Sequence, residues 1–257
     1  MNYIRTLIIR FNNPLTRDKL TKFRGAVVAS MDNSNVLFHN HKEDGLRYSY
    51  PLIQYKVLDN KAAIVCVGEG TEVISDFFTN SELSINIGDD PVAVELEDIK
   101  AERTLVQLWR EPIVYRLLSW VPFNAENYKK YLQLSGIVEQ TQFLENILVG
   151  NILSFLKGVG IRIEERIECH LKYVSEPRSI TFKNVKMICF NVDFSSNISL
   201  PSYIGLGKHP SVGFGLILRK RNPRNNNERG KSVEDNNQSI NDNNKDTNND
   251  EKRTDIS

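Results

Sequence analysis

The chain has 257 residues, of which 40% are hydrophobic, and its 33 basic and 32 acidic side chains leave a net charge of +1. This length and apolar content are enough for one large or two small domains with sizeable cores. The near-neutral balance argues against a protein that grips long stretches of nucleic-acid backbone without specificity, but it leaves room for a local basic patch.

The chain start and the cysteines bear on where the protein works. Residues 1–11 contain two arginines and no apolar core of an export signal, and no run of the sequence approaches the length of a membrane span. Cys66, Cys169 and Cys189 are odd in number and far apart, which argues against a disulfide framework or a zinc site. We expect a cytoplasmic protein with reduced core thiols, no membrane segment, no metal and no other cofactor.

The first part of the chain predicts a strand, a helix and a hairpin. Residues 3–11 are rich in Ile and Leu, and Thr16 then caps a helix with Leu20, Phe23 and Val27 on one face. Two further apolar stretches, residues 50–58 and 61–67, are separated by Asp59-Asn60, a pair suited to a two-residue hairpin turn.

A second helix and a last strand complete this half. The helix opens at Gly70 or Thr71 and carries an apolar stripe made of Val73, Ile74, Phe77 and Phe78. The strand lies within residues 92–109. The resulting order is βαββαβ.

The second half follows a similar plan. It predicts a strand near residues 113–118, a helix over 125–134, and a longer helix over 140–156 that ends at Gly158. Alternating apolar and polar residues at 167–173 and 188–194 predict an antiparallel hairpin, and residues 213–218 predict a closing strand.

Together these elements predict an α+β fold of tandem ferredoxin-like (RRM-like) domains with a C-terminal glycine-rich loop. The boundaries are 1–110 for an N-terminal domain with a histidine loop, 111–220 for a C-terminal domain with the glycine-rich loop, and 221–257 for a disordered Asn-rich tail. The tail has too little apolar surface to offset the entropy of ordering it.

The segment between the first helix and the second strand holds the densest set of reactive side chains. Its candidate catalytic residues are His39, His41, Lys42, Tyr48 and Tyr50. Residues two apart on an extended chain point the same way, so His39 and His41 can address one site, and imidazole suits general acid and base work. A His-x-His pair is also a common half of a metal site, and polar loop histidines with no role are a third reading.

The most informative motif lies near the end of the predicted fold, in residues 205–215. It consists of two Gly-x-Gly pairs around a basic and polar insert, with the candidate phosphate-binding residues Gly205, Gly207, Lys208, Ser211, Gly213 and Gly215. Glycine lets successive amides converge on an anion, and Lys208 adds a positive charge. The spacing matches neither the Walker loop nor the dinucleotide fingerprint. Glycines before a terminal strand can also simply make a tight turn and a bulge.

This motif resembles the C-terminal glycine-rich loop of the CRISPR repeat-RNA endoribonucleases, the sixth family of CRISPR-associated proteins. That family has a Gly-x-Gly pair, a short basic insert and a Gly-aromatic-Gly step into the last strand. Its catalytic histidine lies between the first helix and second strand, where His39 and His41 lie here, and the stretch from Tyr50 to Lys56 is similar to the strand that leaves the site. The resemblance spans nearly all of the residues predicted to be ordered.

The resemblance implies tandem ferredoxin-like domains and metal-independent RNA cleavage, in which a ribose 2′-OH attacks the adjacent phosphorus and leaves 2′,3′-cyclic phosphate and 5′-OH ends. It implies His41 as the principal acid or base, with His39 assisting and Lys42 or Lys56 stabilising charge. Tyr48 and Tyr50 would orient the nucleotide, although strand aromatics facing a core are an equal reading for each.

The implied substrate is the repeat of a CRISPR precursor transcript, bound by a monomer or homodimer, with other Cas effector subunits as further partners. The alternative is a non-catalytic RNA-binding subunit of a CRISPR effector complex, which would keep the fold but have no need of the histidines. A small-molecule nucleotide binder is disfavoured because the sequence has no complete nucleotide motif.

Overall fold

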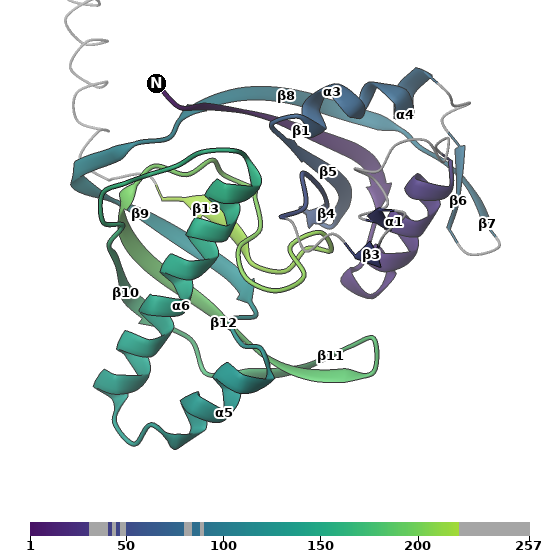
Figure 1. The fold of residues 1–257 in the computed structure, drawn as a ribbon. Coiled ribbons are helices and arrows are strands. Elements are labelled where there is room, and N and C mark those ends of the chain that lie inside the picture. Colours follow the sequence, from purple (N-terminus) through teal and green to yellow (C-terminus); the bar gives the residue numbers. More distant parts are fainter. Residues whose placement is uncertain (31–40, 43–44, 47–49, 80–83, 88–89, 221–257) are drawn as a thin grey trace, which may run out of the picture. The chain divides into compact units, whose positions relative to one another are not determined.

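β1 (Tyr3–Pro14) lies in the interior of the N-terminal sheet. It pairs antiparallel with β5 (Lys61–Val67) and β8 (Leu96–Leu105), and β4 (Ile53–Leu58) lies outside β5. The strand order is therefore β4-β5-β1-β8, the order of a ferredoxin-like βαββαβ unit (Figure 1).

The computed structural model describes residues 1–30, 41–42, 45–46, 50–79, 84–87 and 90–220. The first 220 residues form one compact unit. The predicted disordered tail, residues 221–257, lies outside the described residues.

The hairpin and the first helix match the sequence prediction. Asp59 and Asn60 have φ angles of 52° and 61°, the left-handed conformation that a two-residue type I′ turn requires. The helix α1 (Leu20–Ala29) follows a short 3-10 turn, η1 (Arg17–Lys19), and buries Leu20, Phe23 and Val27 as expected.

The predicted second helix is divided into two short pieces, α3 (Gly70–Val73) and α4 (Ser75–Thr79). Thr71, Val73 and Ile74 are β-branched and favour helix weakly. The stripe nevertheless reaches the core, because Ile74 and Phe77 are buried. Two small hairpins were not predicted. They are β2 (His41–Lys42) with β3 (Gly45–Leu46), and β6 (Ser84–Ile87) with β7 (Asp90–Ala93).

The C-terminal sheet repeats the same order of strands. Its strands are β9 (Leu108–Trp120), β10 (Cys169–Val174), β12 (Val185–Ile198) and β13 (Leu216–Arg219), arranged as β10-β12-β9-β13. The predicted pairing of residues 167–173 with 188–194 is confirmed by β10 and β12. An additional strand, β11 (Arg178–Phe182), forms a hairpin with the start of β12 through a turn at Lys183 and Asn184.

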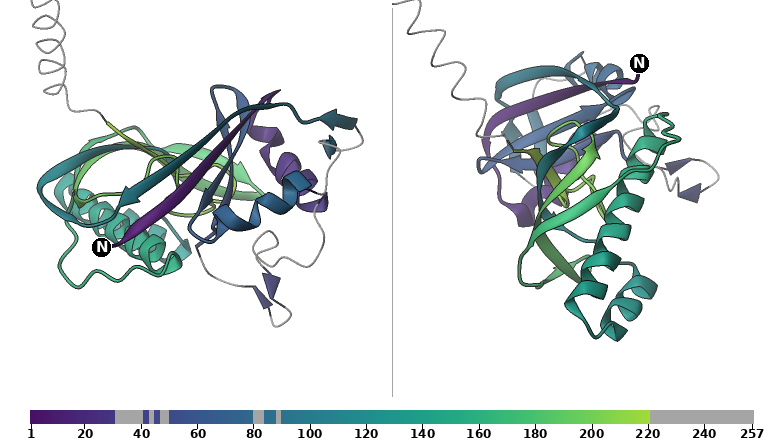
Figure 2. Two further views of the ribbon diagram at one scale, coloured as in Figure 1. Left: turned by 90° about the horizontal axis from the view of Figure 1, so that it is seen from above. Right: turned by 90° about the vertical axis from the view of Figure 1, so that its left-hand side faces the viewer.

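Helices α5 (Ala125–Gln133) and α6 (Ile137–Gly158) lie on one side of this sheet (Figure 2, right). The inner face of α6 buries Leu144, Leu148, Ile152 and Phe155. A ferredoxin-like unit has a second helix between its third and fourth strands. Here the residues between β12 and β13 contain the glycine-rich loop instead. No described helix, α6 included, combines the length and apolarity needed to cross a bilayer.

Apolar side chains fill both faces of the N-terminal sheet. On one face, Ile9 and Ile64 of the sheet share a core with side chains of α1 and with Phe77 of α4. The other face, through Ile8 and Val65, belongs to the core that also holds the α6 and β12 side chains. This double burial explains why residues 61–67 form a continuous apolar run rather than an alternating one.

Candidate functional site

The glycine-rich loop, residues 205–215, closes tightly on itself. The Leu206 amide donates to the Gly215 carbonyl at 2.8 Å, and Gly205 bridges to Leu216 at the start of β13. Gly215 has a φ of 64°, and a β-carbon at this position would lie 1.7 Å from the Leu206 carbonyl oxygen. Any side chain at position 215 would therefore break the turn, so one reason for glycine here is purely conformational.

Gly205 is held by two side chains from the N-terminal half. Its amide donates to Gln54 Oε1 at 2.9 Å, and its carbonyl accepts from the Tyr50 hydroxyl at 2.9 Å. Gln54 Nε2 donates to the same Tyr50 hydroxyl at 2.8 Å, which closes a ring of hydrogen bonds. Burial raises the pKa of the Tyr50 hydroxyl, so it remains a donor at any physiological pH. We call this ring the Gly205 clasp.

The loop also pairs with β4, which would otherwise be the edge strand of the N-terminal sheet. The Tyr55 amide donates to the Ser211 carbonyl at 2.9 Å, and Tyr55 forms a parallel bridge with Val212. An exposed sheet edge presents unpaired backbone groups, and the loop satisfies part of this one. The glycine-rich loop is thus bonded to strands of both sheets.

Lys56 lies beneath the loop and is only 1% exposed. Its ammonium donates to the Pro210 carbonyl at 3.0 Å. Burial, with a smaller contribution from the charge of Arg17, lowers the pKa of Lys56 to about 7. The family resemblance implied Lys42 or Lys56 as the group that stabilises charge in the reaction. In the folded chain the Lys56 amine faces the loop backbone, because β4 directs it inward.

Arg17 and Ser119 form a second connection to the loop. Arg17 donates to the Ser119 hydroxyl at 2.6 Å and to the Gly213 carbonyl at 2.9 Å, and its guanidinium lies 4.7 Å from the centre of the Phe214 ring. Ser119 has a φ of 49°, uncommon for a residue with a side chain. Its carbonyl accepts from the Gly215 amide and its hydroxyl also accepts from Arg178 at 3.4 Å.

The tip of the loop carries one exposed cation, Lys208, and one imidazole, His209. Lys208 is exposed, while its own amide donates to the Val121 carbonyl. Next to it, the His209 ring lies 4.8 Å from the ring of Phe182 in β11, and burial lowers the pKa of this imidazole. Five backbone amides of the loop already donate hydrogen bonds within the protein, those of Gly205, Leu206, Lys208, Val212 and Gly215. Contacts to an anion would therefore rest mainly on side chains and on the remaining amides.

The histidine segment is described only in part. His41 and Lys42 form β2, opposite Leu46 and Gly45 of β3. His39 and Tyr48 lie outside the described residues. Tyr50 is the last residue of this segment, and the Gly205 clasp therefore ties the end of the histidine segment to the glycine-rich loop.

Sequence reasoning named Tyr50, Lys56 and the loop glycines, which the structure brings together. It missed Gln54, Arg17 and Ser119, whose contacts with the loop are described above. Gln54 carried one usable signal, since a glutamine in a predominantly apolar strand is buried only with hydrogen-bond partners. Arg17 and Ser119 carried none, because an arginine before a helix and a serine in a strand are ordinary.

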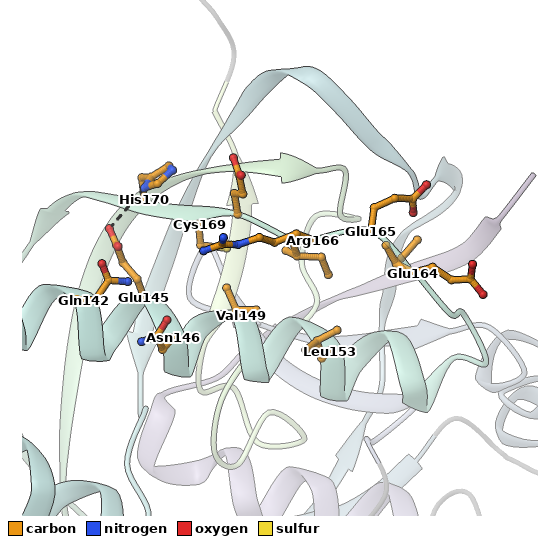
Figure 3. Close-up of a pocket in the computed structure, with 13 residues that line it drawn as sticks. Gln142, Glu145, Asn146, Val149, Leu153, Glu164, Glu165, Arg166, Cys169 and His170 are labelled. Atoms are coloured by element: carbon orange, nitrogen blue, oxygen red, sulfur yellow. Dashed lines mark ion pairs between the residues drawn. The ribbon is translucent and has the colours of Figure 1, made fainter.

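A groove of about 590 Å³ lies elsewhere, between α6 and residues 163–170 (Figure 3). Its lining includes four carboxylates, those of Glu145, Glu164, Glu165 and Glu168, against one guanidinium, that of Arg166. His170 faces Glu145 across it, with 4.0 Å between Nδ1 and Oε1. Among the residues that the structure describes, none of the predicted site residues lines this groove, and its carboxylates would repel a phosphate backbone.

Both halves of the chain match family models of known proteins. The family model of the Cas6b N-terminal domain matches residues 2–105, and that of the Cas6b C-terminal domain matches residues 107–220. An uncharacterized protein of Methanocaldococcus jannaschii is 36% identical over 108 residues, which cover 42% of this chain and 72% of that protein.

Solved structures agree with this assignment. A crystal structure of Cas6b is 26% identical, with a TM-score of 0.77, over 85% of this chain and 100% of that one. A second, titled as a CRISPR RNA processing endoribonuclease Cas6b, is 23% identical over the same shares, with a TM-score of 0.67, and supports the fold. The chain belongs to the Cas6b family, within the Cas6 repeat-RNA endoribonucleases.

The buried Lys56 generates a prediction about pH. Its pKa is about 7 in the folded chain, against an ordinary value of 10.5, so between these values the unfolded chain binds more protons than the folded chain. The free energy of unfolding should therefore rise with pH across this window, by up to about 1.4 kcal/mol per pH unit for this group. Lys56→Met should remove that contribution.

Urea unfolding at pH 7, 8 and 9 of the wild type, Lys56→Met and the exposed control Lys22→Met measures this. The difference between wild type and Lys56→Met should grow in favour of the wild type as pH rises. A difference that stays constant with pH would show that Lys56 titrates normally.

Proposed function

We propose that this protein cleaves CRISPR precursor RNA within its repeats, without a metal ion. The observation that carries the proposal is the Gly205 clasp, which fastens the glycine-rich loop to the residue that ends the histidine segment. Membership of the Cas6b family supports the substrate class. The product would be the processed guide RNA, for use by this protein or by other Cas subunits.

The reaction needs three groups. A base takes the proton of a ribose 2′-OH, whose oxygen then bonds to the adjacent phosphorus. An acid gives a proton to the 5′-oxygen as its bond to phosphorus breaks, and a cation stabilises the charge that develops on the phosphoryl oxygens. The products carry a 2′,3′-cyclic phosphate and a 5′-OH, and the water-free step needs no co-reactant.

We assign His41 as the principal acid or base, with His39 assisting and Lys42 as the stabilising cation. Tyr48 would orient the nucleotide. Lys208 and Ser211 would hold backbone phosphates at the loop, together with whichever amides of Gly207 and Gly213 the RNA reaches. Tyr50 and Lys56 act differently in this account, because their polar atoms position the loop rather than the RNA.

A single-turnover cleavage assay on labelled repeat RNA in excess EDTA tests the chemistry. His41→Ala should slow cleavage by on the order of 100-fold or more with nearly unchanged affinity, because an acid or base acts in the transition state. His170→Ala, which changes a histidine of the acidic groove, is the matched control. A 2′-deoxy sugar at the cut linkage should block cleavage in the wild type.

Loss of cleavage on chelation would contradict metal independence, and cleavage of the 2′-deoxy substrate would contradict 2′-OH attack. If His41→Ala cleaves at the wild-type rate, the role belongs to another residue. Weaker binding with an unchanged rate would make His41 a binding residue.

The exposed Lys208 gives a separate prediction about binding. Lys208→Ala should weaken repeat-RNA binding and reduce the slope of log affinity against log salt by about 0.7, the value for one lost phosphate contact on a single strand. The exposed Lys129→Ala on α5 is the control. Titrations at several salt concentrations measure both slopes, and an unchanged slope for Lys208→Ala would leave the loop with only its structural role.

A further inference from the structure

The C-terminal sheet has a second face, on the side away from α6, that carries polar side chains. Cross-strand neighbours share a face of a sheet, and β12 and β9 place Asp193 opposite Arg116, while β10 places Tyr173 opposite Asp193. Tyr173 is 56% exposed, a high value for a tyrosine in a strand. We call this the open face.

Two cations on the open face share one carboxylate. Arg116 contacts Asp193 through two bonds of 2.8 and 3.0 Å, and Lys220 donates to the same carboxylate at 2.6 Å. These bonds, led by those from Arg116, lower the pKa of Asp193 to about 2. The side chains of Arg116 and Lys220 are 48% and 40% exposed. Since a guanidinium has five N–H donors, Arg116 keeps donors for a further anion.

The open face is hollowed where these residues meet. A pocket of about 480 Å³ is lined by Arg116, Leu118, Tyr173, Asn191 and Asp193, together with Val192. An exposed aromatic ring, an amide and a cation around one pocket are the groups that bind a nucleotide, by stacking on the base, bonding to its edge and contacting its phosphate.

The open face is continuous with the glycine-rich loop through a chain of contacts. Arg178 donates to Asn191 Oδ1 at 3.2 Å and reaches the Ser119 hydroxyl at 3.4 Å. Ser119 accepts from Arg17, which donates to the Gly213 carbonyl. Arg17 and Arg178 therefore connect the glycine-rich loop to the pocket.

We propose that the open face is a second RNA site, which binds a single-stranded segment continuing beyond the part of the repeat held at the glycine-rich loop. The base of one nucleotide stacks on Tyr173 and its phosphate contacts Arg116. The inference rests on the proposed function for its choice of RNA. Phosphate attraction is favoured because the cations Arg116, Lys220 and Arg178 outnumber the single carboxylate of Asp193.

The variant Asp193→Asn distinguishes an RNA site on the open face from an ion network that only stabilises the fold. If the ion network serves only to fasten β13, then Asp193→Asn weakens folding and leaves RNA affinity unchanged. If Arg116 and Lys220 meet phosphate, the same change releases both cations from their internal partner. RNA affinity should then rise roughly severalfold at low salt, with a steeper salt dependence.

The experiment compares three RNAs by fluorescence anisotropy: the repeat alone, the repeat with about ten uridines added at its 5′ end, and the repeat with about ten added at its 3′ end. About ten nucleotides lie within the site size of single-strand binding surfaces. In the wild type the extension on one side should tighten binding. Tyr173→Ala should lower the affinity for that extended RNA by roughly 5- to 150-fold, the effect of losing one stacked base. Tyr128→Ala, a partly exposed tyrosine on α5, is the control.

Cleavage of the unextended repeat reports the proposed function separately, and Tyr173→Ala should leave it unchanged. If the repeat is cut but neither extension adds affinity, the open face is not an RNA site. The inference also fails if Tyr173→Ala keeps the full gain, or if folded Asp193→Asn binds the extended RNA no more tightly. If no repeat RNA is bound or cut, the proposed function itself fails.

Discussion

A single glycine, Gly205, carries the contact on which the arrangement of the site depends. Both of its backbone groups are bonded to side chains from the other half of the chain, Gln54 and Tyr50. Releasing the loop would leave the buried polar groups of Gln54 and Tyr50 without these partners. Each unpaired buried group costs about 1–3 kcal/mol, so the docked loop is favoured. The pairing of Ser211 with Tyr55 and the burial of Lys56 follow only if the loop stays docked.

This constraint gives the glycine-rich loop a structural role, beside the phosphate-binding role that we propose for it. It occupies the place of the helix between the third and fourth strands of a ferredoxin-like unit, so it can reach the edge of the other sheet. Most of its amides near Gly205 and Gly215 are used for this purpose, while the side chain of Lys208 at the tip is exposed and is the group that we propose meets an anion. The two readings of the motif, a tight turn and a phosphate site, are therefore compatible, because different atoms serve each.

Much of the fold could be predicted because it rests on local patterns. Alternation located β10 and β12, and Asp59-Asn60 marked a turn that needs positive φ. The site contacts could not be predicted in this way. Gln54 is 151 residues from Gly205, and no local sequence pattern around either residue indicates that the two are hydrogen-bonded. β11 was missed because its residues lack a strong apolar alternation, and its pairing with β12 gives it order.

We propose that the clasp holds the loop in the form that binds and cleaves repeat RNA. Tyr50→Phe is the decisive variant, because it removes only the hydroxyl that bonds to both Gln54 and Gly205. The control Tyr131→Phe removes a hydroxyl that is bonded to Gln140 and lies far from the loop in sequence. Affinity and single-turnover cleavage should be measured on folded proteins at one temperature. We predict that both fall for Tyr50→Phe and neither for Tyr131→Phe. Wild-type affinity and rate in Tyr50→Phe would contradict the account.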